Sequence, residues 1–267
     1  TGLIVEVGLQ LRPVPSGWLK TRTVAFHSLQ QFFELSQSSA DDWEYTVAWV
    51  DCARAGTVRG IFMCANHTDG NDPLPVKTPK AVPFTPPISL INQASLRAFN
   101  TAYFHSNLGK AGSGRQDFRT FFYPLDALRQ WNRIYGPKGF YQYQSVVPMD
   151  AAQDATQLML DAIARARQGS FLMVLKTFGD IASPGMLSFP MPGVTLAMDF
   201  PNKGREAEQL FERLDAIVAE AQGRIYAAKD ARMPAALFQA GYPALEAFTK
   251  HRDPGLSSAL SRRLLGH

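Results

Sequence analysis

The sequence contains no apolar run approaching the roughly 18 residues that a membrane span requires. Lysine and arginine outnumber aspartate and glutamate only by 27 to 23, and no basic cluster stands out among 267 residues. Nucleic acid is therefore not indicated as a partner. With 46% hydrophobic and 11% aromatic residues, the composition is typical of a soluble globular protein. We expect a cytoplasmic location, with a membrane-associated or periplasmic one left open.

Cysteine is also scarce. The chain has only Cys52 and Cys64, too few for a disulfide framework or a cysteine metal site, so we expect two reduced, buried thiols. Each ends a strand-like run, which would allow the two to approach each other across a hairpin. The five histidines show no metal-ligand or catalytic-triad spacing, and we expect no metal.

The sequence does not begin with methionine, and we expect no signal peptide ahead of its first strand. Thr1-Gly2 leads directly into an apolar strand predicted over 3–11, and the breaker cluster RPVPSG (12–17) follows it. Such a cluster is typical of a domain boundary. We therefore expect a piece of a longer chain, with residues 1–15 ending a domain that precedes it.

The next residues predict a β-α-β-β unit. Strands are expected over 18–26, 44–51 and 60–66, with a helix over 29–37 capped by Ser28. Six prolines between 73 and 87 exclude a regular element there. A helix is expected over 90–102, and the glycine-rich residues 109–114 read as a mobile loop.

A dense segment, FFYPLDALRQWNRIYGPKGFYQYQSVVP (121–148), separates this unit from the next. It predicts a short helix, a turn over 136–139 and a strand over 140–147. A helix capped by Asp150 with Gln153 and ended by Gly169 follows. Strands over 171–178 and 194–200, a helix ended by Gly223 and a strand over 224–226 complete a β-α-β-β-α-β unit.

Two such units predict an α+β fold with duplicated ferredoxin-like units, in which a mostly antiparallel sheet carries its helices on one face. Alternate strand residues point to opposite sides, and three strands each offer one polar side: Gln142 and Gln144, then Lys176, then Thr195 and Asp199. If these sides coincide, the helix-free face could hydrogen-bond a polyhydroxylated ligand. The alternative is the solvent-facing side of an ordinary antiparallel sheet.

Several motifs add a family resemblance: FYPLD (122–126), WNR (131–133), YGPKGF (135–140), QYQ (142–144), LSFP (187–190), DFP (199–201) and YAAKD (226–230). They resemble the substrate domain of the decaprenylphosphoryl-β-D-ribose 2-oxidase family, which are FAD-linked oxidoreductases of the vanillyl-alcohol-oxidase type. The resemblance implies that 1–15 ends a missing FAD-binding domain. It also implies a substrate-binding cap over 16–226 and a C-terminal segment, 227–267, that returns to the FAD domain.

The chemistry implied by the resemblance is oxidation of a secondary alcohol of a sugar or sugar phosphate, with hydride transfer to FAD. This chain alone would then be inactive, and its partners would be that substrate and its own FAD domain. Lys229 and Lys176 resemble lysines near flavin and substrate and are the catalytic and cofactor-binding candidates, with Lys229 favoured for handling a proton. The substrate-binding candidates are Tyr123, Trp131, Gln142, Gln144, Thr195 and Asp199.

Alternatives remain open for the residues and for the function. Tyr123 and Trp131 could be core aromatics, Asp199 could cap or pair locally, and Asp230 with Arg232 reads as a surface or interdomain pair. Val194, Thr195 and Ala197 depart from the family pattern, which leaves the substrate open. A sugar-lactone or alditol oxidase is the second hypothesis, and a stand-alone ferredoxin-like binding module without redox activity is the third.

Overall fold

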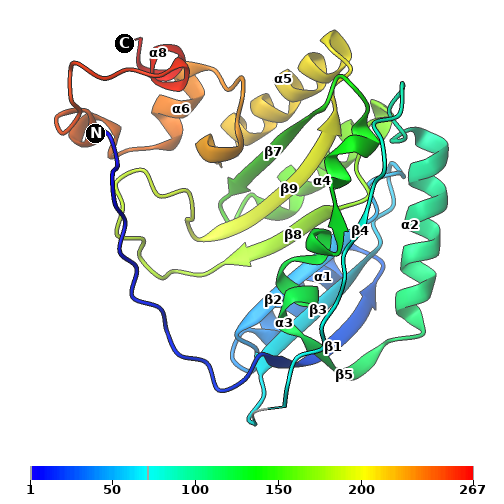
Figure 1. The fold of residues 1–267 in the computed structure, drawn as a ribbon. Helices are drawn as coiled ribbons and strands as arrows, with labels where there is room; N and C mark the ends of the chain where they lie inside the picture. The colour runs from blue at the N-terminus through cyan, green and yellow to red at the C-terminus, as the bar shows by residue number, and fades with distance from the viewer. Residues whose placement is uncertain (1, 71, 267) are drawn as a thin grey trace.

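A computed structural model describes residues 2–70 and 72–266 and has a single large antiparallel sheet at its centre (Figure 1). Its eight strands lie in the order β10-β7-β9-β8-β2-β3-β1-β5. They are β1 (Trp18–Phe26), β2 (Tyr45–Val50), β3 (Gly60–His67), β5 (Gly112–Asp117), β7 (Phe140–Val147), β8 (Met173–Phe178), β9 (Gly193–Pro201) and β10 (Arg224–Ile225). A two-stranded parallel pair, β4 (Lys80–Ala81) and β6 (Leu128–Arg129), lies apart from it.

The strand order shows two copies of one arrangement. Each unit, read from its outer edge toward the middle of the sheet, has its strands in the order fourth-first-third-second. This order is β10-β7-β9-β8 in one unit and β5-β1-β3-β2 in the other. The second strands of the two units, β8 and β2, join them by antiparallel pairing of Ala48 with Leu175 and Trp49 with Val174. The predicted α+β class with duplicated ferredoxin-like units is confirmed.

Three helices cover one face of the sheet. They are α1 (Leu29–Ser39), α4 (Ala152–Arg165) and α5 (Arg205–Glu220), and Figure 1 shows α1 and α4 behind the strands. The main core lies between these helices and strand residues such as Phe62, Leu175 and Leu196, all at most 1% exposed. Ser28 caps α1 as predicted, accepting a hydrogen bond from the Gln31 amide at 3.1 Å.

A fourth long helix, α2 (Gln93–Leu108), lies on the opposite face, although the prediction placed the helices on one face. Phe104 of α2 packs against Trp49 and Ile61, whose side chains alternate with the core-facing Ala48 and Phe62. The connection from β3 to α2 carries β4, which Figure 1 shows in front of the sheet. Because the chain passes in front of the sheet, α2 arrives on that side.

Short elements occupy the dense segment before β7. They are α3 (Phe118–Phe122) and two 3₁₀ helices, η1 (Pro124–Ala127) and η2 (Trp131–Tyr135). Gly136 follows η2 with φ of 77°, and a side chain there would lie 3.0 Å from the backbone of Ile88 and Ser89. Only glycine combines a positive φ with the absence of a side chain. The turn predicted over 136–139 is therefore confirmed.

Three local predictions are wrong. Within the loop predicted over 109–114, residues 112–114 begin the strand β5, because the open edge of β1 offers their backbone a hydrogen-bonding partner. Asp150 does not cap α4, whose N-cap is Ala151 without a side-chain hydrogen bond; Asp150 binds the Ala151 amide instead. Residues 3–11 form an extended coil and not a strand, since no described strand lies beside them to pair with.

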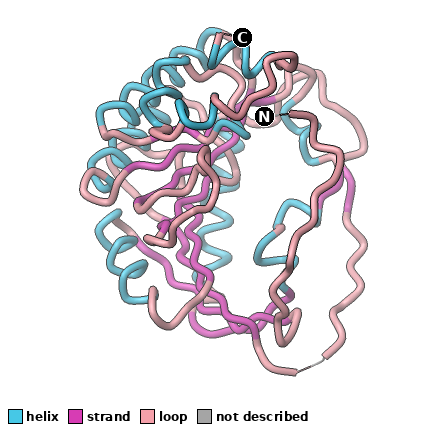
Figure 2. Tube along the Cα trace, turned by 90° about the vertical axis from the view of Figure 1, so that its left-hand side faces the viewer, coloured by secondary structure: helices cyan, strands magenta, loops and turns pink. Residues whose placement is uncertain are grey.

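The chain ends in small helices packed beside β10. The helices are α6 (Ala235–Gly241), α7 (Leu245–Thr249) and α8 (Ala259–Leu265), and the 3₁₀ helix η3 (Ala227–Lys229) precedes them. Leu237, Phe238 and Leu264 join the main core, so this segment is an integral part of the fold. In Figure 2 the N-terminal coil stands away from the strands and its start lies near the C-terminal helices.

Candidate functional site

The register of three central strands places the predicted polar residues on one face. Gln142 of β7 lies opposite Asp199 of β9, and Lys176 of β8 lies opposite Thr195. Gln144 shares the side of Gln142 because it lies two residues further along the strand. We call these five side chains the polar face. The residues between them, including Leu196 and Met198, point into the core on the other side.

One hydrogen bond within the polar face orients its centre. The Gln144 carboxamide donates from Nε2 to the Thr195 hydroxyl at 3.1 Å. Thr195 is buried, Gln144 is half-buried and Gln142 is exposed. The inner carboxamide is therefore held by Thr195, while the outer one lies in an exposed position and hydrogen-bonds the Asp199 carboxyl group.

Asp199 is the acidic group of the polar face and is only 8% exposed. Burial raises its pKa above the ordinary value, and the Gln142 carboxamide and the positive charge of Lys229 partly offset that shift. Of the two local alternatives, helix capping does not apply because Asp199 lies inside β9, whereas a local partner is present in the Gln142 carboxamide. Its carboxyl group therefore faces the polar face and accepts hydrogen bonds most readily while ionised.

Lys229 reaches this region from the end of η3. The Tyr226 amide donates to the Gln144 carbonyl at 2.9 Å, and the Lys229 amide donates to the Tyr226 carbonyl at 3.0 Å. These backbone hydrogen bonds attach η3 to β7 beside Gln144. The Lys229 side chain is exposed and lies close enough to Asp199 and Lys176 to affect the pKa of each.

Lys176 is exposed to solvent on one side, yet its pKa is lowered. The main cause is partial desolvation by the surrounding side chains, and the second is repulsion from Lys229. Two ammonium groups this close favour an anion between them, and a lowered pKa lets a lysine give up a proton at a lower pH. The structure thus brings together both predicted lysines, which lie on different elements.

Trp131 lies at one end of the polar face. Its ring packs against Phe140 at 5.3 Å, and Phe140 stacks with Tyr135 at 4.6 Å. Phe140 points to the same side as Gln142, two residues away. The aromatic rings of η2 therefore pack over this end of the polar face.

Tyr123 follows α3 and is 54% exposed. It packs against Phe122 at 6.3 Å, and Phe122 lies against Tyr45 of β2 at 4.8 Å. These contacts lie over the first unit of the sheet, whereas the polar face lies over the second. The contribution of Tyr123 to a substrate pocket stays a prediction.

Tyr135 is a neighbour of the site that the sequence did not single out. It is 4% exposed, and burial together with the charge of Asp199 raises its pKa strongly. Its hydroxyl lies 3.5 Å from the Ser170 hydroxyl. The YGPKGF motif could have identified Tyr135, because a tyrosine that directly precedes the turn into β7 lies next to the first residues of that strand.

The expected pairing of Asp230 with Arg232 at a surface is wrong. Arg232 forms an ion pair with Asp215 of α5, while Asp230 pairs with Arg263 of α8. Asp215 also accepts a hydrogen bond from the Tyr143 hydroxyl at 3.2 Å, and burial raises its pKa to about 6. Both carboxylates lie in the interior, where sequence proximity does not choose the partner.

Two hollows lie away from the polar face. One, of about 420 Å³, is mostly apolar and is lined by α8, Leu187, Phe238 and the start of the chain. The other, of about 370 Å³, lies between α6 and α7 near Tyr242. We take the polar face as the candidate site because it gathers a lysine, an aspartate, two glutamines and a threonine on one surface, whereas the charged residues that line the hollows are Arg252 in the first and Glu246 in the second.

Cys52 and Cys64 are both buried and free; Cys52 contacts the Ser170 carbonyl and Cys64 the Ser39 hydroxyl, so they do not face each other across a hairpin. Within the described residues, no helix combines the length and apolar character needed to cross a membrane.

Comparison with known proteins gives a related oxidase. The chain is 32% identical over 293 residues to decaprenylphosphoryl-beta-D-ribose oxidase of Mycolicibacterium smegmatis, covering 99% of this chain and 60% of that protein. The resemblance predicted from the motifs is thereby confirmed. The chain spans only part of that relative's length, so the activity of a whole protein is a matter for proposal.

Other comparisons are more distant. An uncharacterized protein in the mprA 5' region of Streptomyces coelicolor is 27% identical over 285 residues, covering 99% of this chain and 77% of that protein. Among solved structures, berberine bridge enzyme from Eschscholzia californica aligns with a TM-score of 0.44 at 12% identity, over 79% of this chain and 42% of that one. No family model matches the chain.

Proposed function

We propose that this chain is the substrate-binding part of an FAD-dependent oxidoreductase that oxidises a secondary alcohol of a sugar or sugar phosphate. The observation that carries the proposal is the pair Lys176 and Lys229 beside the Asp199 carboxyl group on the polar face. The similarity to an oxidase named for a phosphoryl-ribose compound supports the choice of substrate class.

The polar face offers what a sugar requires. Gln142 and Gln144 carry amide donors and carbonyl acceptors, Thr195 a hydroxyl, and Asp199 an acceptor for sugar hydroxyls. Trp131 provides an aromatic wall near that end of the face. A sugar ring laid against these groups would be oriented by several hydrogen bonds, which is how a site fixes one hydroxyl among many.

The lysines suit the proton in the reaction. Bound FAD would supply the electron acceptor, taking the hydride from the carbinol carbon. The hydroxyl proton has to leave as well, and either lysine could accept it or stabilise the developing alkoxide. The pKa of Lys176 is lowered by desolvation and by the charge of Lys229, which suits the first role. The positive charge of both lysines also suits the flavin's electron-rich reduced form.

The ends of the chain fit a flavin domain that lies outside this sequence. Leu3, Val5 and Leu9 are 78% to 89% exposed, in contrast to the buried apolar residues of the core. Residues 1–15 would complete the flavin domain and residues 16–226 would form the cap. Residues 227–267, which pack on the main core through Leu237, Phe238 and Leu264, would return toward the flavin domain. The exposed apolar side chains would be buried by such a contact.

The test uses the full-length, flavin-loaded protein. Lys229→Met and Lys176→Met should each slow flavin reduction about 100-fold, the scale of lost general acid–base catalysis, with the thermal transition unchanged. Lys110→Met, an exposed lysine after α2, is the matched control. Unchanged reduction rates in both variants would remove the lysines from the site.

The choice of substrate and the cap assignment need separate measurements. Steady-state assays with aldonolactones, alditols and phosphoribosyl lipids distinguish the proposed function from a sugar-lactone or alditol oxidase. Stoichiometric FAD retention with turnover by this chain alone would sink its assignment as a cap. Sugar binding without any flavin-linked partner domain in the gene would favour a stand-alone binding module.

A further inference from the structure

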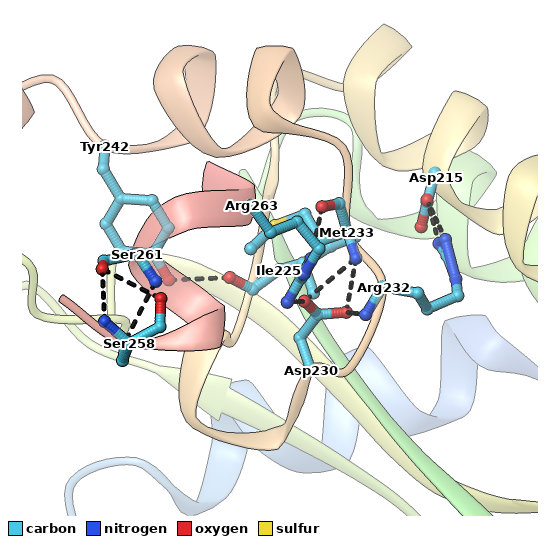
Figure 3. A network of polar contacts seen from close by, with 9 residues as sticks. All are labelled: Asp215, Ile225, Asp230, Arg232, Met233, Tyr242, Ser258, Ser261 and Arg263. Atoms are coloured by element: carbon cyan, nitrogen blue, oxygen red, sulfur yellow. Dashed lines mark hydrogen bonds and ion pairs between the residues drawn. The ribbon is translucent and has the colours of Figure 1, made fainter. Parts of the chain in front are cut away.

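The turn that follows Lys229 is locked by a single carboxylate. Asp230 accepts hydrogen bonds from the Arg232 amide at 3.0 Å and from the Met233 amide at 2.8 Å. Figure 3 shows these bonds converging on its two oxygens. The backbone over 230–233 is therefore held in one shape, and Lys229 lies immediately before it.

The C-terminal helix supplies the charge that balances Asp230. Arg263 of α8 donates to the Asp230 carboxylate at 2.8 Å and to the Met233 carbonyl at 2.5 Å. The Asp230 side chain is 7% exposed and the Arg263 side chain 28%. One guanidinium group thus hydrogen-bonds both Asp230 at the start of the turn and Met233 at its end. A lysine could not reproduce this two-point geometry.

The same turn is anchored on its other side. Arg232 pairs with Asp215 of α5 and lies over the Phe211 ring at 5.1 Å. On the preceding side, the Tyr226 amide is bonded to β7. The Lys229 side chain is exposed and lies on a segment whose backbone is held from three sides. Among these three anchors, α8 is the one that comes from the end of the chain.

We propose that Arg263 is a positioning residue, through which helix α8 places Lys229 beside Lys176 and Asp199. The positioning itself concerns this chain alone, whereas its consequence for catalysis rests on the proposed function. Arg263 touches neither the polar face nor any reacting group. It acts through Asp230 and the backbone of residues 230–233.

The first test needs no flavin. With reductively ¹³C-methylated lysines, NMR titration reports the pKa of Lys176, and Lys229→Met should raise that pKa because it removes a neighbouring charge. Arg263→Met should raise it in the same direction, by displacing Lys229. Arg262→Met is the matched control, since Arg262 is an exposed neighbour that contacts Ser257.

Hydrogen exchange gives the structural half of this test. In Arg263→Met the Arg232 and Met233 amides should exchange at least tenfold faster, while amides of β7 keep their protection. Arg263→Lys, which retains a charge for Asp230, should give an intermediate acceleration and keeps the test valid if the methionine variant unfolds. Faster exchange with an unchanged Lys176 pKa would show that Arg263 merely stabilises the turn, and would overturn the inference.

The second test is a double-mutant cycle in the full-length, flavin-loaded protein. If Arg263 acts through Lys229, Arg263→Met slows flavin reduction at least tenfold in the wild type and adds nothing in the Lys229→Met background. An equal slowing in both backgrounds would contradict the inference. A Lys229→Met variant with normal reduction would defeat the proposed function instead, and the NMR titration would still decide whether Arg263 positions Lys229.

Discussion

The buried ion pair between Arg232 and Asp215 gives the most quantitative prediction. The Arg232 side chain is 21% exposed and the Asp215 side chain 8%, and Tyr143 is the other hydrogen-bonding partner of that carboxylate. Arg232→Met keeps the apolar length over Phe211 but leaves the carboxylate without its counter-charge. Breaking such a pair costs about 3–5 kcal/mol of unfolding free energy.

The pH dependence of this loss has a definite sign. The folded-state pKa of Asp215 is raised by burial from 3.8 to about 6. Its contribution to stability is therefore fully present below pH 3.8 and is lost as the pH rises through 6. Arg232 lowers this pKa, so its removal should raise the pKa further. The cost of Arg232→Met should therefore be smaller at pH 5 than at pH 7.5.

Urea unfolding followed by circular dichroism at both pH values measures this difference. Arg165→Met is the control, because Arg165 pairs with Asp161 at 3.9 Å on the surface of α4, and an exposed pair contributes about 1 kcal/mol or less. If Arg232→Met costs no more than this control, or costs more at pH 5 than at pH 7.5, the account of a buried, charge-compensated pair is refuted.

Two further predictions concern backbone packing and thiol chemistry. Gly193→Ala should lower the free energy of unfolding, measured in urea, by at least about 2 kcal/mol, because a Cβ there would lie 2.1 Å from the Val147 carbonyl oxygen. The control Gly179→Ala, where a Cβ would meet nothing within 4 Å, should be close to neutral. Equal losses in the two variants would show that β7 and β9 can shift apart. Burial raises the pKa of Cys52 to about 11. At pH 8 the fraction of Cys52 present as thiolate should therefore be about 100-fold lower than that of a solvent-exposed cysteine with an ordinary pKa. Peptide mapping after iodoacetamide treatment should find Cys52 labelled only in denaturant, and rapid labelling of the native protein would contradict its burial.

Much of the central sheet could be predicted from the sequence, because its signals are local. The strand over 140–147 and the helix capped by Ser28 depend on alternation and on a side chain that reaches its own backbone. The shared side of Gln142, Gln144, Lys176, Thr195 and Asp199 also followed from strand parity, once the three strands were neighbours in register.

The errors arose where a partner far along the chain decides the outcome. Residues 112–117 have the composition of a loop, yet the free edge of β1 makes them a strand. Asp230 and Arg232 are two residues apart, but their ion-pair partners are Arg263 and Asp215. Similarly, α2 lies on the unexpected face because the chain between 68 and 92 crosses the sheet first. None of these choices leaves a local pattern in the residues concerned.

The join between β8 and β2 has a consequence for how this fold could arise. Both are second strands of their units, and they pair antiparallel at Ala48–Leu175 and Trp49–Val174. Two identical four-stranded chains meeting edge to edge about a twofold axis would build the same eight-stranded sheet. A homodimer fused into one gene would afterwards be free to specialise its halves. In this chain the hydrogen-bonding side chains of the polar face lie on the second half, whereas α2 packs on the first half.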